Sequence, residues 1–277
     1  MKIDNFTIFI FLIILFFYII IVNKICNSKE SLQIYEYDTK IKGPKIVIIG
    51  GTHGNEPSGA VTIKDMIKNI NNKNINLKKG KLILIPEVNY CGLRVGIRFI
   101  PLIGDLNRKY PHKINNSRLN NSKLNNSRLN NSKLNNICPI TKQIINSIDD
   151  ADFVLDFHEG WGFHRVTKES MGSTISPTNT DESYIIAEKM LKKVNEQINN
   201  DDKKFNIFTD NKNFLSNEYY SQGDEIKGSL RYYQNLNKKN YILIETTGQN
   251  DIQPLHIRKN QCDIFINELL THYDMIN

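Results

Sequence analysis

Residues 45–56, KIVIIGGTHGNE, decide the fold and carry the first candidate site residues. The apolar run at 46–49 predicts a buried strand over 45–49, and the Gly-Gly pair after it predicts a tight turn. His53 and Glu56 follow at once, at the sheet edge where α/β proteins place their ligand sites. An imidazole and a carboxylate about one helical turn apart suit zinc, although such a pair is more often an ordinary surface hydrogen bond. The rest of the chain must therefore supply a third ligand and a base.

Two later segments end as the first one does. The run ADFVLDF at 151–157 predicts a strand that is followed by His158, and YILI at 241–244 predicts a strand that is followed by Glu245. The carboxyl ends of parallel strands meet at one edge of a sheet. We therefore expect His53, His158 and Glu245 to converge on that edge.

Strand and helix patterns alternate along most of the chain. Further strands are expected at 31–41, 81–88 and 205–208, and helices at 57–70, 139–148, 181–198 and 255–273. This alternation predicts a mostly parallel sheet that is covered by helices on both faces.

Composition narrows the classes of function. The chain has 277 residues, 40% of them hydrophobic, and a net charge of +7. Four of the cations lie in one low-complexity tract: Arg118, Lys123, Arg128 and Lys133. Without them the balance is ordinary, so no nucleic-acid binding is expected. The four cysteines form no C-x-x-C pair, so we expect free thiols, with a Cys91–Cys138 bridge as the alternative, and no cysteine zinc site.

The N-terminus has the pattern of a membrane segment. Residues 6–22 are apolar and uncharged, which is at the short end of what spans a bilayer and longer than most signal-peptide apolar regions. Residues 26–28, Cys-Asn-Ser, match a cleavage site poorly. We therefore predict a single-pass N-terminal anchor and stem at 1–30, with secretion after signal cleavage as the alternative. Lysines flank both sides, so the orientation is left open.

The tract at 115–136 is four copies of NNS(R/K)L followed by Asn-Asn. A period of five fits neither a helix face nor a strand face, and the tract has too few apolar residues to offset its ordering entropy. We predict a disordered Asn-rich insertion at 111–137 within the main domain, which covers 31–277.

Zinc catalysis needs three protein ligands and one open position for water. His53, Glu56 and His158 would supply the ligands, and the metal would lower the pKa of its bound water toward about 7. Glu245 is the natural base to take the proton and to pass it to the leaving group. Arginine suits both a developing negative charge and a substrate carboxylate.

Five short motifs occur together in this chain: GGTHGNE, GIR, DLNR, DFHEG and IETTG. In order and spacing, from about residue 44 to 262 apart from the insertion, they resemble the zinc carboxypeptidase superfamily, and most closely its succinylglutamate desuccinylase/aspartoacylase branch. The resemblance implies one zinc ion per chain held by His53, Glu56 and His158, with Glu245 as the catalytic base. It also implies a three-layer α/β/α sandwich with a mixed sheet of about eight strands, to which the predicted transmembrane helix would be joined.

The resemblance extends to substrate binding. It implies that Asn107 and Arg108 of DLNR hold a substrate carboxylate and that Arg98 of GIR polarises the scissile carbonyl. The strand-end histidine is followed by Glu159 and not by the Asn-Thr-Thr run of aspartoacylase proper, so the resemblance does not reach N-acetylaspartate specificity. We expect Glu159 to support the adjoining ligand.

These features favour a membrane-tethered zinc hydrolase that cleaves an amide bond by Glu-assisted attack of zinc-bound water, with N-acyl amino acid deacylation as the first expectation. The expected partners are a small carboxylate-bearing amide or peptide and, through residues 6–22, a membrane. A metallocarboxypeptidase or a peptidoglycan-type amidase is the alternative. An inactive membrane-anchored binding module ranks lower, because the ligands, the base and the carboxylate clamp are all present.

Overall fold

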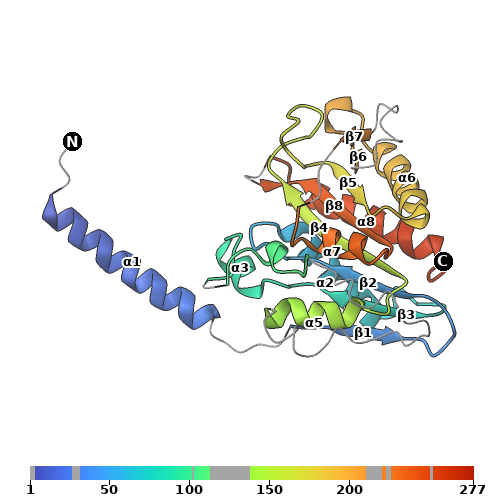
Figure 1. Ribbon diagram of the computed structural model, residues 1–277, viewed down its shortest axis with the longest axis horizontal. Coiled ribbons are helices and arrows are strands. Elements are labelled where there is room, and N and C mark those ends of the chain that lie inside the picture. The colour runs from blue at the N-terminus through green and yellow to red at the C-terminus, as the bar shows by residue number, and fades with distance from the viewer. Residues whose placement is uncertain are drawn as a thin grey trace, which may run out of the picture.

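The computed structural model describes residues 4–26, 32–101, 103–112, 138–209, 220–222, 226–249 and 252–277. Within them, eight strands form one mixed sheet in the order β1-β3-β2-β4-β8-β5-β6-β7 (Figure 1). The strands are β1 (Tyr35–Asp38), β2 (Lys45–Ile49), β3 (Lys81–Ile85), β4 (Phe153–Gly160), β5 (Thr174–Pro177), β6 (Asn206–Thr209), β7 (Tyr220–Gln222) and β8 (Tyr241–Thr247). Antiparallel pairing occurs between β1 and β3 and between β5 and β8. The predicted mixed, mostly parallel sheet of about eight strands is confirmed.

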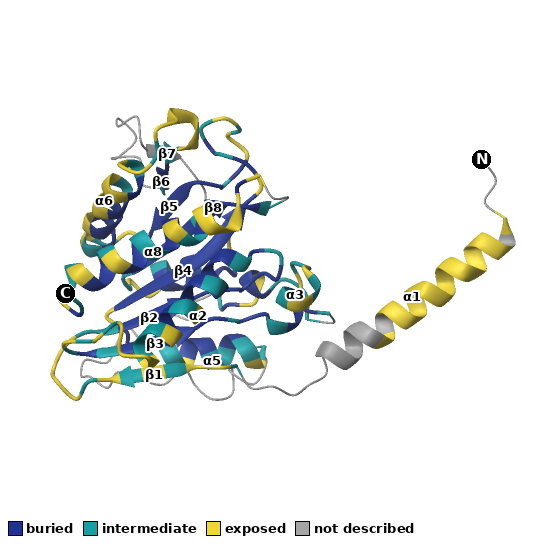
Figure 2. Cartoon of the chain, turned by 180° about the vertical axis from the view of Figure 1, so that it is seen from behind, coloured by how far each residue is buried: buried dark blue, intermediate teal, exposed yellow. Residues whose placement is uncertain are grey.

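Helices cover both faces of the sheet. One face carries α2 (Pro57–Asn71), α6 (Asp181–Asn195) and α8 (Leu255–His272), and the other carries α5 (Pro139–Ile148) and α7 (Leu230–Leu236). Because neighbouring side chains of a strand point to opposite faces, Ile46 and Ile48 join the first core, while Val47 and Ile49 join the second. The strands form the buried centre between the helices (Figure 2). The three-layer α/β/α architecture is as expected.

The two strands that deliver site residues are longer than predicted. β4 and β8 pair in parallel register beyond their apolar runs, so that His158 lies beside Glu245 and Gly160 beside Thr247. His158 and Glu245 thus belong to strands instead of following them. The ladder hydrogen bonds and the covering loops keep this polar extension buried, which apolar periodicity alone does not reveal.

Several short elements were not predicted. They are β5, β7, α7 and α3 (Tyr90–Val95). Asn89 caps α3, because its Oδ1 accepts a hydrogen bond from the Gly92 N–H at 2.7 Å. Cys138 and Cys262 are free thiols, so the alternative Cys91–Cys138 bridge is not formed. Cys91 is disulfide-bonded, so the expectation of free thiols is wrong for this residue.

The N-terminal apolar segment forms a helix, α1 (Asn5–Cys26), which projects from the rest of the chain (Figure 1). Its described large apolar side chains, from Phe6 to Ile20, are exposed. In the described part of the chain, no helix combines the length and hydropathy that a membrane span requires, so the predicted transmembrane anchor is not supported. Membrane localisation and its alternative, secretion, stay predictions.

The predicted Asn-rich insertion lies almost entirely outside the described residues, which stop at 112 and resume at 138. The boundaries proposed for it and for the anchor, stem and hydrolase domain therefore stay predictions.

Candidate metal centre

A glycine-rich loop after β2 brings the first two candidate ligands to the sheet edge. Gly51 has a φ of 66°, a left-handed conformation that glycine adopts without strain. A Cβ on Gly54 would lie 1.9 Å from the carbonyl carbon of Gly92 in α3. The loop therefore packs directly against the backbone of α3, and this close approach fixes His53 and Glu56 just before α2 begins.

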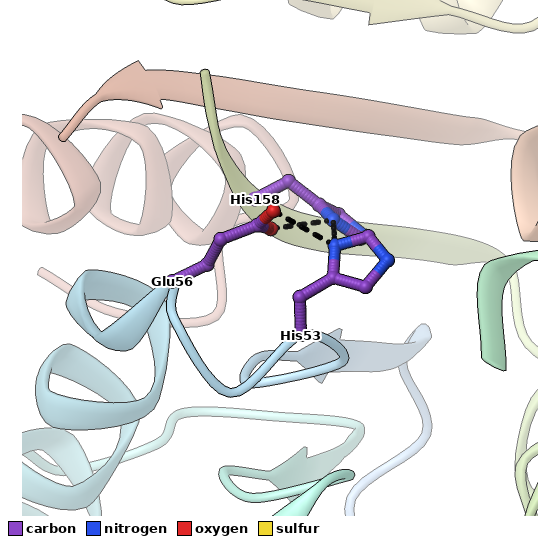
Figure 3. Close-up of side chains that lie close together, drawn as sticks. All are labelled: His53, Glu56 and His158. Carbon is purple, nitrogen blue, oxygen red and sulfur yellow. Dashed lines mark hydrogen bonds and ion pairs between the residues drawn. The ribbon is translucent and has the colours of Figure 1, made fainter. Parts of the chain in front are cut away.

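His53, Glu56 and His158 meet in one buried cluster (Figure 3). The Nδ1 atom of His53 lies 2.9 Å from Glu56 Oε1, and that of His158 lies 2.9 Å from Glu56 Oε2. The two Nδ1 atoms are 3.0 Å apart. Each of the three residues is only 2% exposed. The structure thus brings together the three residues that the sequence analysis proposed as ligands.

The Nε2 atom of each imidazole contacts a carboxylate. His53 Nε2 lies 3.1 Å from Asp105 Oδ1, and His158 Nε2 lies 3.3 Å from Asp156 Oδ2. The Tyr241 hydroxyl donates a second hydrogen bond to Asp156 at 2.9 Å. With both Nε2 atoms protonated, the Nδ1 lone pairs face the centre of the cluster, which is the usual arrangement of metal-ligating histidines.

The electrostatics of the cluster favour a cation. Burial alone would raise the pKa of Glu56, but the two imidazoles outweigh burial and hold that pKa well below its ordinary value. Burial alone would lower the pKa of His158, but Asp156 and Glu56 raise it well above the ordinary value. The site therefore stabilises positive charge between its donors.

The donor set fits zinc. Two imidazole nitrogens and one carboxylate form one of the ligand sets of catalytic zinc sites, and zinc binds both donor types. Three lone-pair donors that face one another at about 3 Å repel unless a proton or a metal ion lies among them. His53, Glu56 and His158 are thus the residues that would hold the ion.

Glu245 lies beside the cluster and at the wall of a cavity. It is the direct neighbour of His158 in the β4–β8 ladder. The cavity has a volume of about 320 Å³ and is also lined by His53 and Glu56. Burial raises the pKa of Glu245, the His158 ring opposes the shift and the Glu56 carboxylate reinforces it. The predicted base and two of the predicted ligands therefore face one space.

Arg98 also lines this cavity, but its guanidinium forms hydrogen bonds with two carboxylates. One NH group donates to Glu56 Oε1 at 2.9 Å, and Nε and the other NH group each lie 3.3 Å from Asp105 Oδ2. The side chain stays 31% exposed, so part of the cation faces the cavity. The structure places Arg98 at the candidate metal ligands, while its predicted role on a scissile carbonyl stays a prediction.

Asn107 and Arg108 line the same cavity. The Asn107 Oδ1 atom accepts a hydrogen bond from the Leu230 N–H at 2.9 Å, which leaves its NH₂ group as the end suited to a carboxylate. The exposed Arg108 side chain donates to the Asn107 carbonyl at 2.7 Å. Both residues thus lie on the cavity wall, while their implied role in holding a substrate carboxylate stays a prediction.

Sequence reasoning missed three side chains that contact the ligands: Asp105, Asp156 and Gln249. Asp105 begins the DLNR motif, and Asp156 lies two positions before His158, so alternation along the strand could have indicated it. The Gln249 Nε2 atom donates to Glu56 Oε1 at 3.1 Å across 193 positions, and no local signal announces that contact.

Comparisons with known proteins concern the family and the fold of the chain. Residues 42–170 match the family described as the succinylglutamate desuccinylase/aspartoacylase catalytic domain. None of the curated proteins matches the sequence significantly.

Solved structures share the fold. The cell shape determinant protein Csd4 from Helicobacter pylori, as a Gln46His variant, is 18% identical, with a TM-score of 0.64 over 88% of this chain and 55% of that one. An aspartoacylase family protein from Mesorhizobium loti is 17% identical, with a TM-score of 0.54 over 90% and 63% of the two chains. The ectoine utilization protein EutE (DoeB) from Ruegeria pomeroyi is 16% identical, with a TM-score of 0.54 over 89% and 62%.

This chain spans about 55% of the length of Csd4, and the identities are low, so these likenesses concern the fold. The family match covers residues 42–170, which include His53, Glu56 and His158. The sequence match over residues 42–170 and the shared fold confirm the resemblance to the succinylglutamate desuccinylase/aspartoacylase family.

Proposed function

We propose that the chain is a zinc-dependent hydrolase that cleaves the amide bond of a small carboxylate-bearing substrate, with an N-acyl amino acid as the first candidate. The observation that carries this proposal is the buried His53–Glu56–His158 cluster beside a cavity that Glu245 also lines. A binding module would have no need of a base beside its metal ligands.

The residues divide the chemistry among them. A bound zinc ion would polarise the scissile carbonyl and activate a water molecule. Glu245 takes a proton from the attacking water and delivers it to the leaving nitrogen, so that the hydroxyl ends on the acyl carbon and the amine leaves neutral. The part of Arg98 that faces the cavity supplies positive charge near the carbonyl oxygen, where negative charge develops.

Substrate orientation falls to Asn107 and Arg108. Guanidinium and amide N–H groups match a carboxylate, and both side chains lie on the wall of the cavity that holds Glu245. A carboxylate held there fixes the amide relative to the metal ligands. Positioning of this kind contributes much of the rate of such reactions.

A metallocarboxypeptidase is the second candidate, and one observation favours it. The Csd4 structures, one of them described as a D,L-carboxypeptidase bound to mDAP and another as bound to a tripeptide, align with TM-scores of 0.62–0.64. The aspartoacylase family protein aligns at 0.54. A peptidase needs the same ligands, base and carboxylate clamp, and a peptidoglycan-type amidase is a variant of this candidate.

A substrate panel separates these candidates. The purified full chain, loaded with zinc, is given N-acyl amino acids and short peptides with a free carboxyl terminus, and release of the amine is measured. We expect hydrolysis of at least one N-acyl amino acid, loss of the activity with a chelator and recovery with zinc. Cleavage of peptides alone would favour the carboxypeptidase, and no cleavage of either class would contradict the proposal.

A further inference from the structure

Glu159, the residue next to the candidate ligand His158, forms a buried ion pair with Arg258. Glu159 follows His158 in β4, and one of its carboxylate oxygens contacts the guanidinium of Arg258 on α8. Glu159 is 1% exposed and Arg258 is 3% exposed. A buried carboxylate is costly unless it is paired and hydrogen-bonded, so this pair calls for an explanation.

The other oxygen of Glu159 binds the start of α2. Glu56 occupies the position just before this helix, where a side chain usually accepts a hydrogen bond from one of the first N–H groups. Glu56 makes no such bond, because its carboxylate is turned toward the two imidazoles. Glu159 Oε1 accepts from the Ser58 N–H instead, at 2.6 Å.

The backbone of Glu159 is tied to the same ligand. Its N–H donates to Glu56 Oε2 at 3.2 Å. Gln249 donates to Glu56 Oε1 at 3.1 Å and also contacts the Glu159 carbonyl, so it links the two residues. The adjoining Gly248 leaves no room for a side chain, since a Cβ there would lie 2.0 Å from Glu159 Oε2. These contacts join the ligand, the helix start and the ion pair in one network.

We propose that Glu159, neutralised by Arg258, is a positioning residue for the metal ligand Glu56. It takes over the capping of α2 that Glu56 would otherwise perform, so the Glu56 carboxylate is free to face the imidazoles. The positive end of the helix dipole adds to the attraction of the Glu159 carboxylate for this position. The inference rests on the proposed function, because it assumes that the cluster binds zinc.

Zinc affinity of the full chain tests this role directly. Zinc is titrated in competition with a chromophoric chelator into the wild type, Glu159→Ala and a control, Ile63→Ala. Ile63 lies in α2 and is fully buried in the core, away from the network, so its loss loosens the same helix without touching Glu56. The melting temperature is measured for each variant.

We expect Glu159→Ala to weaken zinc binding at least tenfold relative to Ile63→Ala, since partners that orient a metal ligand typically contribute about 10–100-fold in affinity. A smaller difference between the two variants would overturn the proposal, because loosening of α2 would then explain the effect. If Glu159→Ala does not fold, Glu159→Gln decides, because a side chain of the same size offers an oxygen to only one of the two partners. Its affinity should fall at least threefold, and unchanged affinity would overturn the proposal. A wild type that does not bind zinc would instead refute the proposed function.

Discussion

Replacing Glu245 by glutamine tests its role as the base with the least disturbance of the structure. The substitution keeps the size of the side chain and removes its ability to accept a proton. Glu245 neighbours His158 in the β4–β8 ladder but is not one of the three clustered donors, so zinc binding should persist. General-base catalysis typically contributes about 10²–10⁴-fold, which corresponds to about 3–5 kcal/mol of transition-state stabilisation.

We therefore expect kcat of Glu245→Gln to fall by about 10²–10⁴-fold, with bound zinc unchanged. The assay measures kcat on the best substrate of the panel and zinc content on the same preparation. Glu169→Gln is the matched control, because Glu169 lines the same cavity, is exposed, and has no part in the proposed chemistry. Its kcat should stay within about threefold of the wild type, which is below 1 kcal/mol. A Glu245→Gln enzyme with near wild-type kcat would remove Glu245 from the mechanism.

Three further changes test other parts of the account. Asp156→Asn should weaken zinc binding by about 10–100-fold, because the carboxylate orients His158; equal affinity in a chelator competition would contradict this role. Arg108→Ala should raise KM more than it lowers kcat, because its proposed contact with the substrate carboxylate persists through the reaction, and steady-state kinetics would show the reverse pattern if the residue acted on the transition state alone. Gly54→Ala should lower the free energy of unfolding by about 1–3 kcal/mol, because its Cβ would collide with the backbone of α3; unchanged denaturant unfolding would show that the loop relaxes.

The covered, mostly parallel sheet and the candidate ligands could be predicted from local apolar runs and the polar residues after them, whereas the sandwich of about eight strands was implied by the family resemblance. Strand β2 has the predicted bounds 45–49, and helix α5 has the predicted bounds 139–148. Strand ends share a sheet edge by topology, which is why His53 and His158 could be proposed as ligands although 105 positions separate them.

The missed features depend on tertiary contacts. β5, with the sequence TISP, has no apolar run, and its burial comes from the strands and helices around it. Glu159 pairs with Arg258 across 99 positions, and this pairing depends on how α8 packs. No sequence pattern around either residue predicts the other as its partner. The polar ends of β4 and β8 belong to the strands because the hydrogen-bonded pairing of the two strands continues through them. The hydropathy of the sequence does not predict this pairing.

The central claim is that two imidazoles and one carboxylate hold a single ion, and metal stoichiometry tests it most directly. Purified full chain, reconstituted with zinc and dialysed, is analysed for zinc content next to Glu56→Ala. The account predicts close to one zinc ion per chain in the wild type and loss of that zinc in the variant. A wild type without zinc, or a Glu56→Ala protein that keeps the full amount, would contradict it.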